Sequence, residues 1–174
     1  MKWGKYVLGA LIVAVIVHLA AIFAVPRVLM NVAMDRLGAA GVNAWHLSDR
    51  VTAASRWVVR PAPDFAYSAC VFDLSQGPVV ITATPWDDYW SLSLYAANSD
   101  NFFVIDDREA HNGAEITLVR RGAAHPEGAS MVTESPSARG IALIRRLAPT
   151  PSTYDAAKAV AAEDVCASVA SLHS

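Results

Sequence analysis

Hydrophobic and polar positions divide the chain into an apolar N-terminal run, a middle of short alternating segments and a tail with helical spacing. The apolar run extends from Tyr6 to Val25 and contains no Lys, Arg, Asp or Glu. A helix of about twenty residues is about 30 Å long, which matches the hydrocarbon core of a bilayer. The run therefore predicts a transmembrane anchor, which we assign to residues 1–27.

A short amphipathic segment follows Pro26, which interrupts the apolar pattern. Its apolar residues fall on one side of a helix and are Val28, Leu29, Val32, Ala33 and Leu37. Gly38 and Gly41 are typical of a helix end. We expect a connector helix within residues 28–42 that lies near the membrane or docks on the domain that follows.

The middle of the chain contains short β-like segments separated by turns rich in Pro, Gly, Asn and Asp. The segments are Tyr67–Asp73, Val79–Ala83, Tyr89–Ala96, Phe102–Ile105, Glu115–Arg120, Ser130–Thr133 and Arg139–Leu147. Because no helical pattern separates them, they predict an antiparallel β-sandwich or an open barrel-like domain. The clearest two-residue period places Trp90, Leu92 and Leu94 in the core. Further core candidates are Ile116, Leu118, Ile141 and Leu143.

Less regular segments precede these strands, and one helix follows them. His46–Ala54 is interpreted as a short helix, and Arg56–Arg60 alternates enough to be a strand. Between Pro151 and Leu172 apolar residues return at helical spacing, after a Pro-Ser-Thr start signal. We therefore expect a mainly β domain over residues 43–174 that ends in a C-terminal helix.

The basic residues around the apolar run predict how the anchor is oriented. Lys2 and Lys5 precede the run, whereas Arg27 is the only basic residue directly after it. This distribution places the N-terminus inside and the remainder outside. A cleavable signal peptide ending near Ala24 is the alternative. The apolar run is longer than a usual signal core and lacks a small-x-small ending, which favours an uncleaved anchor.

Overall charge excludes one class of partner. The net charge is −2, and the Lys and Arg residues are scattered rather than gathered into a basic face. Nucleic acid would require such a face, so we expect no nucleic-acid binding. The doublets Arg120-Arg121 and Arg145-Arg146 are interpreted as solvated strand ends.

The two cysteines, Cys70 and Cys166, allow two interpretations. In an oxidising compartment an even number of cysteines makes a disulfide plausible. Cys70 falls in a predicted strand and Cys166 in the predicted helix, so pairing requires the helix to cross that strand. The alternative is two buried thiols. No CxxC or HxxxH spacing occurs, and we expect no metal site.

His18 is the one ionisable residue of the apolar run apart from Tyr6, and such a residue inside a membrane is a candidate functional group. The simplest interpretation is a neutral imidazole that bonds to a neighbouring helix or reaches toward the interface. The alternative is that His18 ligates a pigment or haem within a larger assembly.

The stretch Arg60–Pro78 contains the candidate ligand-binding residues Asp64, Tyr67 and Asp73. Asp64 follows a proline-braced turn and can bond backbone donors, so that it and Tyr67 brace the start of the first strand. The alternative is a polar pocket floor where the three residues bind a ligand. No nucleophile elbow or other catalytic signature is present, and we assign no catalytic residue and no cofactor.

Several short motifs resemble the bacterial family catalogued as domain of unknown function 1254. They are Asn43-x-Trp45, Val58-Val59-Arg60-Pro61 with Asp64, Tyr67-Ser68, Asp73-Leu74-Ser75, Gly77-Pro78-Val79-Val80, Asp88-Tyr89-Trp90-Ser91-Leu92 and Asn98 to Phe103. The likeness covers Asn43 to Leu147, although Ala62-Pro63 stands where many members carry polar Asn residues. It implies an exported β-sandwich-like domain, often fused to or neighbouring a domain catalogued as 1214, for which this chain lacks room. It implies no activity.

Together these observations support two functional hypotheses. The first is a single-pass protein of the bacterial inner (cytoplasmic) membrane, with a cytoplasmic N-terminus and a periplasmic β domain. That domain would act as a binding or assembly module or an accessory subunit of a membrane complex, with the lipid bilayer and a protein such as a 1214-type domain as partners. The second is an envelope enzyme acting on a small or carbohydrate-like metabolite near Asp64 and Tyr67. The absence of a catalytic signature favours the first.

Overall fold

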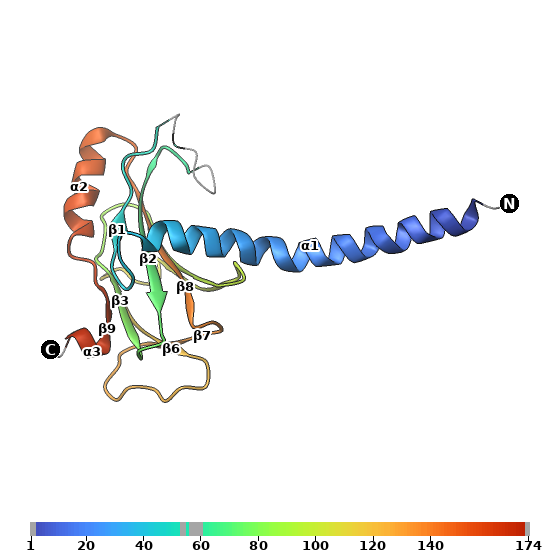
Figure 1. Cartoon of the computed structure of the whole chain (residues 1–174). Coiled ribbons are helices and arrows are strands. Elements are labelled where there is room, and N and C mark those ends of the chain that lie inside the picture. Colours follow the sequence, from blue (N-terminus) through green and yellow to red (C-terminus); the bar gives the residue numbers. More distant parts are fainter. Residues whose placement is uncertain (1–2, 53–54, 56–60, 173–174) are drawn as a thin grey trace.

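The computed structural model describes residues 3–52, 55 and 61–172, and it shows one long helix joined to a two-layer β domain (Figure 1). The elements are α1 (Gly4–Gly38), β1 (His46–Leu47), β2 (Phe65–Asp73), β3 (Val79–Ala83), β4 (Trp90–Ala96), β5 (Asn101–Asp106), β6 (Ala114–Arg120), β7 (Val132–Ser135), β8 (Arg139–Leu147), α2 (Pro151–Ala161), β9 (Cys166–Ser168) and α3 (Val169–Leu172). The five-stranded sheet has the order β1-β2-β8-β4-β5, and the four-stranded sheet has the order β7-β6-β3-β9.

The predicted fold class is confirmed, and each of the seven predicted β segments corresponds to a strand. β3 and β8 have the predicted bounds. All pairings in the five-stranded sheet are antiparallel, and the one parallel pairing of the four-stranded sheet joins β6 to β7. The alternation of apolar and polar residues therefore predicts these strands, most clearly where a face is buried along the strand, as in β3 and β8.

The main core lies between the two sheets and includes Trp90, Leu92 and Leu94, as predicted. The opposite face of β4 is buried as well, since Ser91 and Ser93 are only 1% and 2% exposed. β4 is flanked by β8 and β5, and Ser91 accepts a hydrogen bond from the Arg145 guanidinium. The buried hydroxyl of Ser91 is thus accommodated on this face because the long side chain of Arg145 bonds to it.

α1 is a single helix that continues through Pro26, so the expected interruption at this proline does not occur. The amphipathic stretch after Pro26 is the last part of the same helix. A proline inside a helix removes one backbone hydrogen bond. Two side chains bond carbonyls nearby: Ser99 Oγ donates to the Pro26 carbonyl at 3.0 Å, and Arg27 Nη1 donates to the Phe23 carbonyl at 2.6 Å.

The C-terminal part of α1 packs on the outer face of the five-stranded sheet. Met30 and Met34 form a second apolar cluster with Ala69, Val71 and Ile141. The sequence predicts Ile141 and Leu143 in the core of the domain. Both residues instead pack toward α1, outside the core between the sheets. In β8 the inward positions are Ala142 and Ile144 instead.

The tail is not the single helix expected from Pro151 to Leu172. α2 begins at a Thr150 cap, where Thr150 and Thr153 form a capping box, and it ends at Ala161. Cys166–Ser168 then pairs with β3 as β9, and only Val169–Leu172 is helical again. Helical spacing is overridden here because the backbone of this segment completes the hydrogen bonding of an edge of the four-stranded sheet.

The segment before β2 also differs from the expectation. His46–Leu47 is strand β1, paired with β2, and Ser48–Thr52 is irregular, so the short helix expected at His46–Ala54 is absent from the described part of that segment. The backbone of Ser48 instead donates to the Tyr67 carbonyl at 2.9 Å. The strand expected at Arg56–Arg60 lies outside the described residues.

Candidate functional site

Asp64 and Tyr67 lie at the start of β2, but their side chains lie in different surroundings. The Tyr67 hydroxyl accepts a hydrogen bond from the Ala62 backbone N–H at 2.9 Å. The Asp64 side chain is exposed, whereas its backbone carbonyl accepts from Ala148 at 2.7 Å. Tyr67 thus closes the proline-containing turn, and Asp64 contributes through its backbone.

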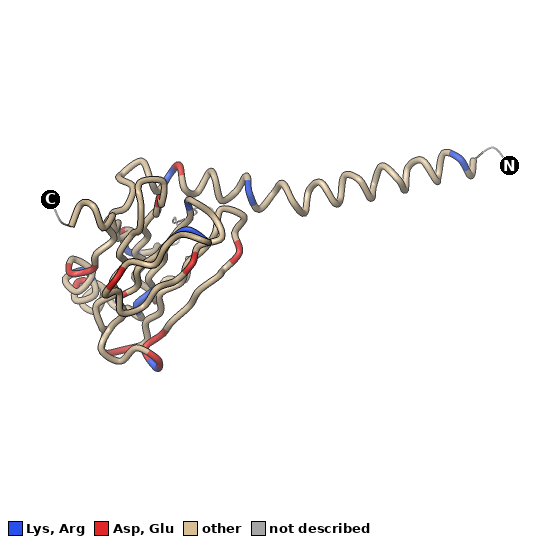
Figure 2. The backbone as a smooth tube through the Cα atoms, turned by 90° about the horizontal axis from the view of Figure 1, so that it is seen from below, with Lys and Arg blue, Asp and Glu red and all other residues tan. Residues whose placement is uncertain are grey.

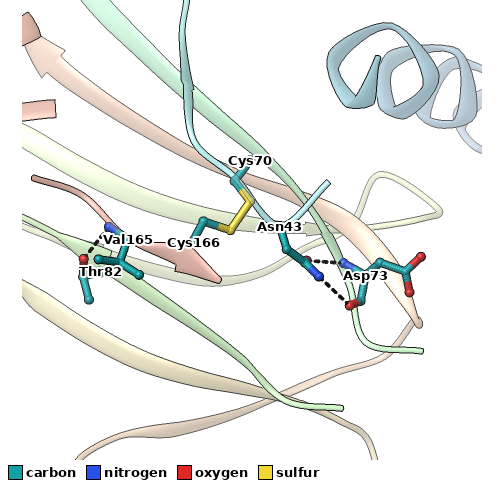
Figure 3. The surroundings of a disulfide bond; sticks show 6 residues. All are labelled: Asn43, Cys70, Asp73, Thr82, Val165 and Cys166. Atoms are coloured by element: carbon teal, nitrogen blue, oxygen red, sulfur yellow. Dashed lines mark hydrogen bonds between the residues drawn. A yellow bond between two sulfur atoms is a disulfide. The ribbon is translucent and has the colours of Figure 1, made fainter. Parts of the chain in front are cut away.

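Asp73 lies at the other end of β2, six residues from Tyr67, which corresponds to about 20 Å along a strand. Its carboxylate accepts from the Ser75 N–H at 2.8 Å and lies 3.6 Å from Arg139 Nε. The Asn43 side chain bonds both backbone groups of Asp73, as Figure 3 shows. Asp73 therefore forms a turn and a strand-edge contact, and the structure does not bring it together with Asp64 and Tyr67.

Cys70 and Cys166 form a disulfide, which joins β2 of one sheet to β9 of the other (Figure 3). Their Cα atoms are 6.6 Å apart, and the two residues are separated by 96 positions in the sequence. Cys166 lies in a strand and not in the predicted helix, so a strand and not a crossing helix brings it to Cys70. Beside it, the Val165 N–H donates to Thr82 Oγ1 at 2.7 Å, which holds β9 against β3.

A buried ion pair next to the disulfide was not predicted from the sequence. Arg146, expected at a solvated strand end, and Asp164 have side chains that are 2% and 0% exposed. Two guanidinium nitrogens of Arg146 donate to the Asp164 carboxylate at 2.8 Å, and one also donates to the Thr84 carbonyl. The Thr84 N–H donates to Asp164 as well. The available signal was the two-residue period of β8, in which Arg146 follows the inward positions Ala142 and Ile144.

His18 lies within α1, where its side chain is exposed like those around it. Within the described residues, no group of three or more His, Cys, Asp and Glu side chains could hold a metal ion.

A pocket of about 580 Å³ lies between the end of α1 and the outer face of the five-stranded sheet, and we call it the α1 pocket. Its walls come from α1, β2, β4, β8 and from residues near Ser48 and Pro61. Tyr67 lines it, whereas Asp64 and Asp73 do not. Besides the phenols Tyr67 and Tyr95, the ionisable residues among its described lining are Arg145, Arg36 and Asp49.

Arg145 is the most unusual member of the α1 pocket. One terminal nitrogen donates to Ser91 Oγ at 3.2 Å, while Nε is buried and has no hydrogen-bond partner among the described residues. None of the ion pairs between described residues involves Arg145. The sequence did not reveal this pocket because its members lie on four separate elements.

A smaller pocket of about 330 Å³ lies where α1 meets the loop after β4. Arg27 and Asn31 line it from α1, and Asn98 lines it from the loop. The Ser99 bond to the Pro26 carbonyl lies at the same junction. This contact fixes the helix to the domain close to the end of the apolar run.

Comparisons with known proteins identify one family and two similar structures. The family described as "Protein of unknown function (DUF1254)" matches residues 42–167. The crystal structure of the VPA0106 protein from Vibrio parahaemolyticus is similar at 11% identity, with a TM-score of 0.60 over 84% of this chain. An uncharacterized protein from Burkholderia cenocepacia shares 18% identity over 63% of this chain and 33% of its own, with a TM-score of 0.46.

These comparisons bear on fold and on size. The Vibrio structure supports the β fold alone, because its identity to this chain is low. This chain spans 38% of the length of that protein. No curated protein matches the chain.

Proposed function

This chain belongs to the DUF1254 family, whose function is unknown, and from that premise we propose that it is a single-pass membrane protein whose β domain faces the periplasm. The domain acts as a binding or assembly module or an accessory subunit of a membrane complex. Its membrane is the inner membrane of a bacterium. Its partner is a protein such as a 1214-type domain.

One observation carries the proposal: the most apolar part of α1 is exposed on all sides, whereas its C-terminal end packs on the domain. The apolar 18-residue window of α1 is 0% buried. Figure 2 shows no charged residue on the helix between Lys5 and Arg27. Exposed apolar surface of this extent is stabilised by a bilayer. Met30 and Met34 then bury the last turns of the same helix on the five-stranded sheet.

The periplasmic orientation is supported by two independent features. Lys2 and Lys5 outnumber the single Arg27 on the other side of the apolar run, which favours a cytoplasmic N-terminus. The Cys70–Cys166 disulfide fits an oxidising compartment such as the periplasm.

The assembly role is supported by an unprotected strand edge. β5 is an outer strand of the five-stranded sheet as described, and its sequence NFFVID contains no Lys or Pro. Val104, at the middle of β5, is 56% exposed. The one charged residue of β5, Asp106, is its last, and a strand edge that carries no charge or proline over its middle is a template for pairing with another chain. The enzyme hypothesis is not favoured, because Asp64, Tyr67 and Asp73 do not form a common site.

The test is purification of the full chain from its native membranes in a mild detergent, followed by native mass spectrometry. We expect a stoichiometric protein partner. Val104→Lys, on the β5 edge, should reduce partner recovery, whereas Val42→Lys, at an exposed valine outside β5, should not. A chain that is recovered only as a monomer, without a co-purifying protein, would contradict the assembly role.

A further inference from the structure

We propose that the α1 pocket binds the acyl chain of a single-chain anionic lipid from the adjacent membrane, with the lipid headgroup at Arg145. This inference rests on the proposed membrane anchoring, because the lipid enters from the bilayer that surrounds α1. It goes beyond the assembly role in naming a ligand and its site.

The outer face of the five-stranded sheet changes from polar to apolar along the strands. Tyr67 and Ser91 flank Arg145 directly in the ladder, so these residues form one polar row across three strands. In the next row Leu143 lies between Ala69 and Ser93, and in the row after it Ile141 lies between Val71 and Tyr95. Of these residues, the ones that line the pocket are Ala69, Leu143, Ile141 and Tyr95. Successive rows on one face are about 7 Å apart. The floor of the pocket therefore has a polar end and an apolar end, as an amphiphile requires.

The wall opposite this floor is apolar as well. Met30, Ala33 and Leu37 line the pocket from α1, on the side of the helix that faces the sheet. A volume of about 580 Å³ lies within the range of roughly 300–1,000 Å³ typical of small-molecule sites. The chemistry of the walls suits a hydrocarbon chain better than a sugar or a nucleotide.

The headgroup is expected to be an anion because the positively charged Arg145 has a buried donor that lacks a partner within the described part of the chain. Its buried Nε lacks a partner among the described residues, and a buried, unpaired donor on a charged group is costly. A carboxylate or phosphate oxygen would satisfy it. Arg36 adds a second positive charge to the pocket lining and Asp49 one negative charge, so the ionised side chains sum to one net positive charge.

The position of the pocket indicates that the ligand comes from the bilayer. Met30 is three residues beyond Arg27, and Leu37 is seven beyond Met30, so the α1 wall spans about 5 to 15 Å from Arg27 along the helix. Arg27 ends the uncharged run of α1. A lipid that leaves the outer leaflet would therefore reach the pocket within three helical turns of the bilayer.

The experiment uses the full chain in phosphatidylcholine nanodiscs, which avoids competition from detergent. The probe is an oleate analogue with a photoreactive diazirine on its chain. After illumination, peptide mapping should find the label on the pocket segments of α1 and β8. Excess oleate should compete with the probe, whereas the uncharged methyl oleate should not.

Two variants with matched controls test the two halves of the site. Ala33→Phe fills the apolar wall and should abolish pocket labelling, while Val32→Phe, on the exposed side of the same helix, should leave it unchanged. Arg145→Met should reduce labelling about tenfold or more, since a hydrogen bond to a charged group is of that strength. Arg120→Met, at an exposed arginine of β6, should leave labelling unchanged.

Other results would overturn the inference. Label confined to the apolar run of α1 would mean partition into the bilayer only. Equal competition by methyl oleate would contradict recognition of an anionic headgroup. Equal labelling of Ala33→Phe and Val32→Phe would contradict binding in the pocket. Vesicle flotation reports the anchor separately, so a chain that floats without pocket labelling contradicts the lipid site and leaves the proposed function intact.

Discussion

At the scale of single residues, the charges of Arg146 and Asp164 are the ones most fully removed from solvent. Each charge loses its hydration, and the pair is tolerated because two ion-pair bonds and bonds to the Thr84 backbone replace it. The pair joins β8 to the segment that leads into β9. It therefore stabilises the contact between the two sheets.

Replacing Asp164 with Asn should destabilise the domain strongly. The change leaves the Arg146 charge buried without a counter-charge, at a cost of about 3–5 kcal/mol. Thermal unfolding followed by circular dichroism should show a midpoint lowered by about 10 °C. The control is Glu134→Gln, which removes the exposed ion pair with His125 and should change stability by less than about 1 kcal/mol. Equal midpoints for the two variants would contradict the assigned role.

Tyr154 makes the stability of the domain depend on pH in the alkaline range. Burial raises the pKa of its phenol above the ordinary value of 10.0, and the negative charges of Asp49 and Asp155 raise it further. The neutral hydroxyl donates to the Ser48 carbonyl at 2.6 Å. Because the folded-state pKa is raised, its contribution to stability is fully present below pH 10 and is lost as the pH rises through the folded-state pKa.

Tyr154→Phe should therefore be less stable than the unmodified chain at pH 8, and the difference should shrink above pH 10. The measurement is the thermal midpoint of both proteins between pH 8 and pH 11. A difference that stays constant over this range would show that Tyr154 does not contribute through its protonation.

At the scale of elements, the short strand β9 depends on covalent and polar contacts from its neighbours. It has three residues, and it is held by the Cys70–Cys166 disulfide and by pairing with β3. The disulfide links residues that are 96 positions apart, so it restricts the unfolded chain considerably.

Removing the disulfide with the double substitution Cys70→Ala and Cys166→Ala should cost about 4–5 kcal/mol, on the chain-entropy estimate for a loop of this length. Urea unfolding should show the loss. Reductant should destabilise the unmodified chain and have no effect on the double variant. Destabilisation of both by reductant would point to another cause.

The end of α1 is the second element whose position depends on few contacts. Met34 is 2% exposed against the five-stranded sheet, whereas Val32 on the same helix is 37% exposed. This packing of one side of α1 couples the orientation of the β domain to that of the long apolar helix.

Met34→Ala should loosen this coupling, because truncating a buried Met costs about 2–5 kcal/mol. Hydrogen exchange of the amides between residues 31 and 38 should accelerate by about 30-fold or more. Val32→Ala should leave the exchange rates nearly unchanged. Similar rates in both variants would mean that the helix end is not held by Met34.

At the scale of the whole molecule, a long apolar helix is joined through the packing of its last turns to a disulfide-linked two-sheet domain (Figure 1). The strands of the five-stranded sheet are crossed by α1, whose apolar part extends away from the domain. In the proposed membrane arrangement, the β5 edge and the α1 pocket would both lie on the side of the bilayer that the domain faces.

The proposed periplasmic orientation predicts the behaviour of C-terminal fusions. Alkaline phosphatase, which requires disulfide formation, should be active when fused after residue 174, and a fluorescent protein that fails to mature in the periplasm should stay dark. Active phosphatase with exposed Cys70 and Cys166 thiols would contradict the disulfide, and a fluorescent fusion would contradict the orientation.

Local sequence patterns predict the strands from β2 to β8, the apolar helix and the family likeness, because alternation, apolar run length and proline or glycine turns act over a few residues. They do not predict β1 and β9, which lie where helices were expected. The sequence also indicated Cys70 and Cys166 as a pair, although it left their bonding open. Asp64, Tyr67 and Asp73 are close in sequence, but the extended strand β2 separates Asp73 from the other two, so the three residues do not form one site.

Only the tertiary structure decided which residues share a site. Strand pairing placed Arg145 between Tyr67 and Ser91, and the packing of α1 covered that row to form the pocket. The same pairing turned Arg146 inward to Asp164 and drew Cys166 into a strand. These contacts join residues far apart in the chain, and their energies depend on burial and register, which local sequence patterns do not determine.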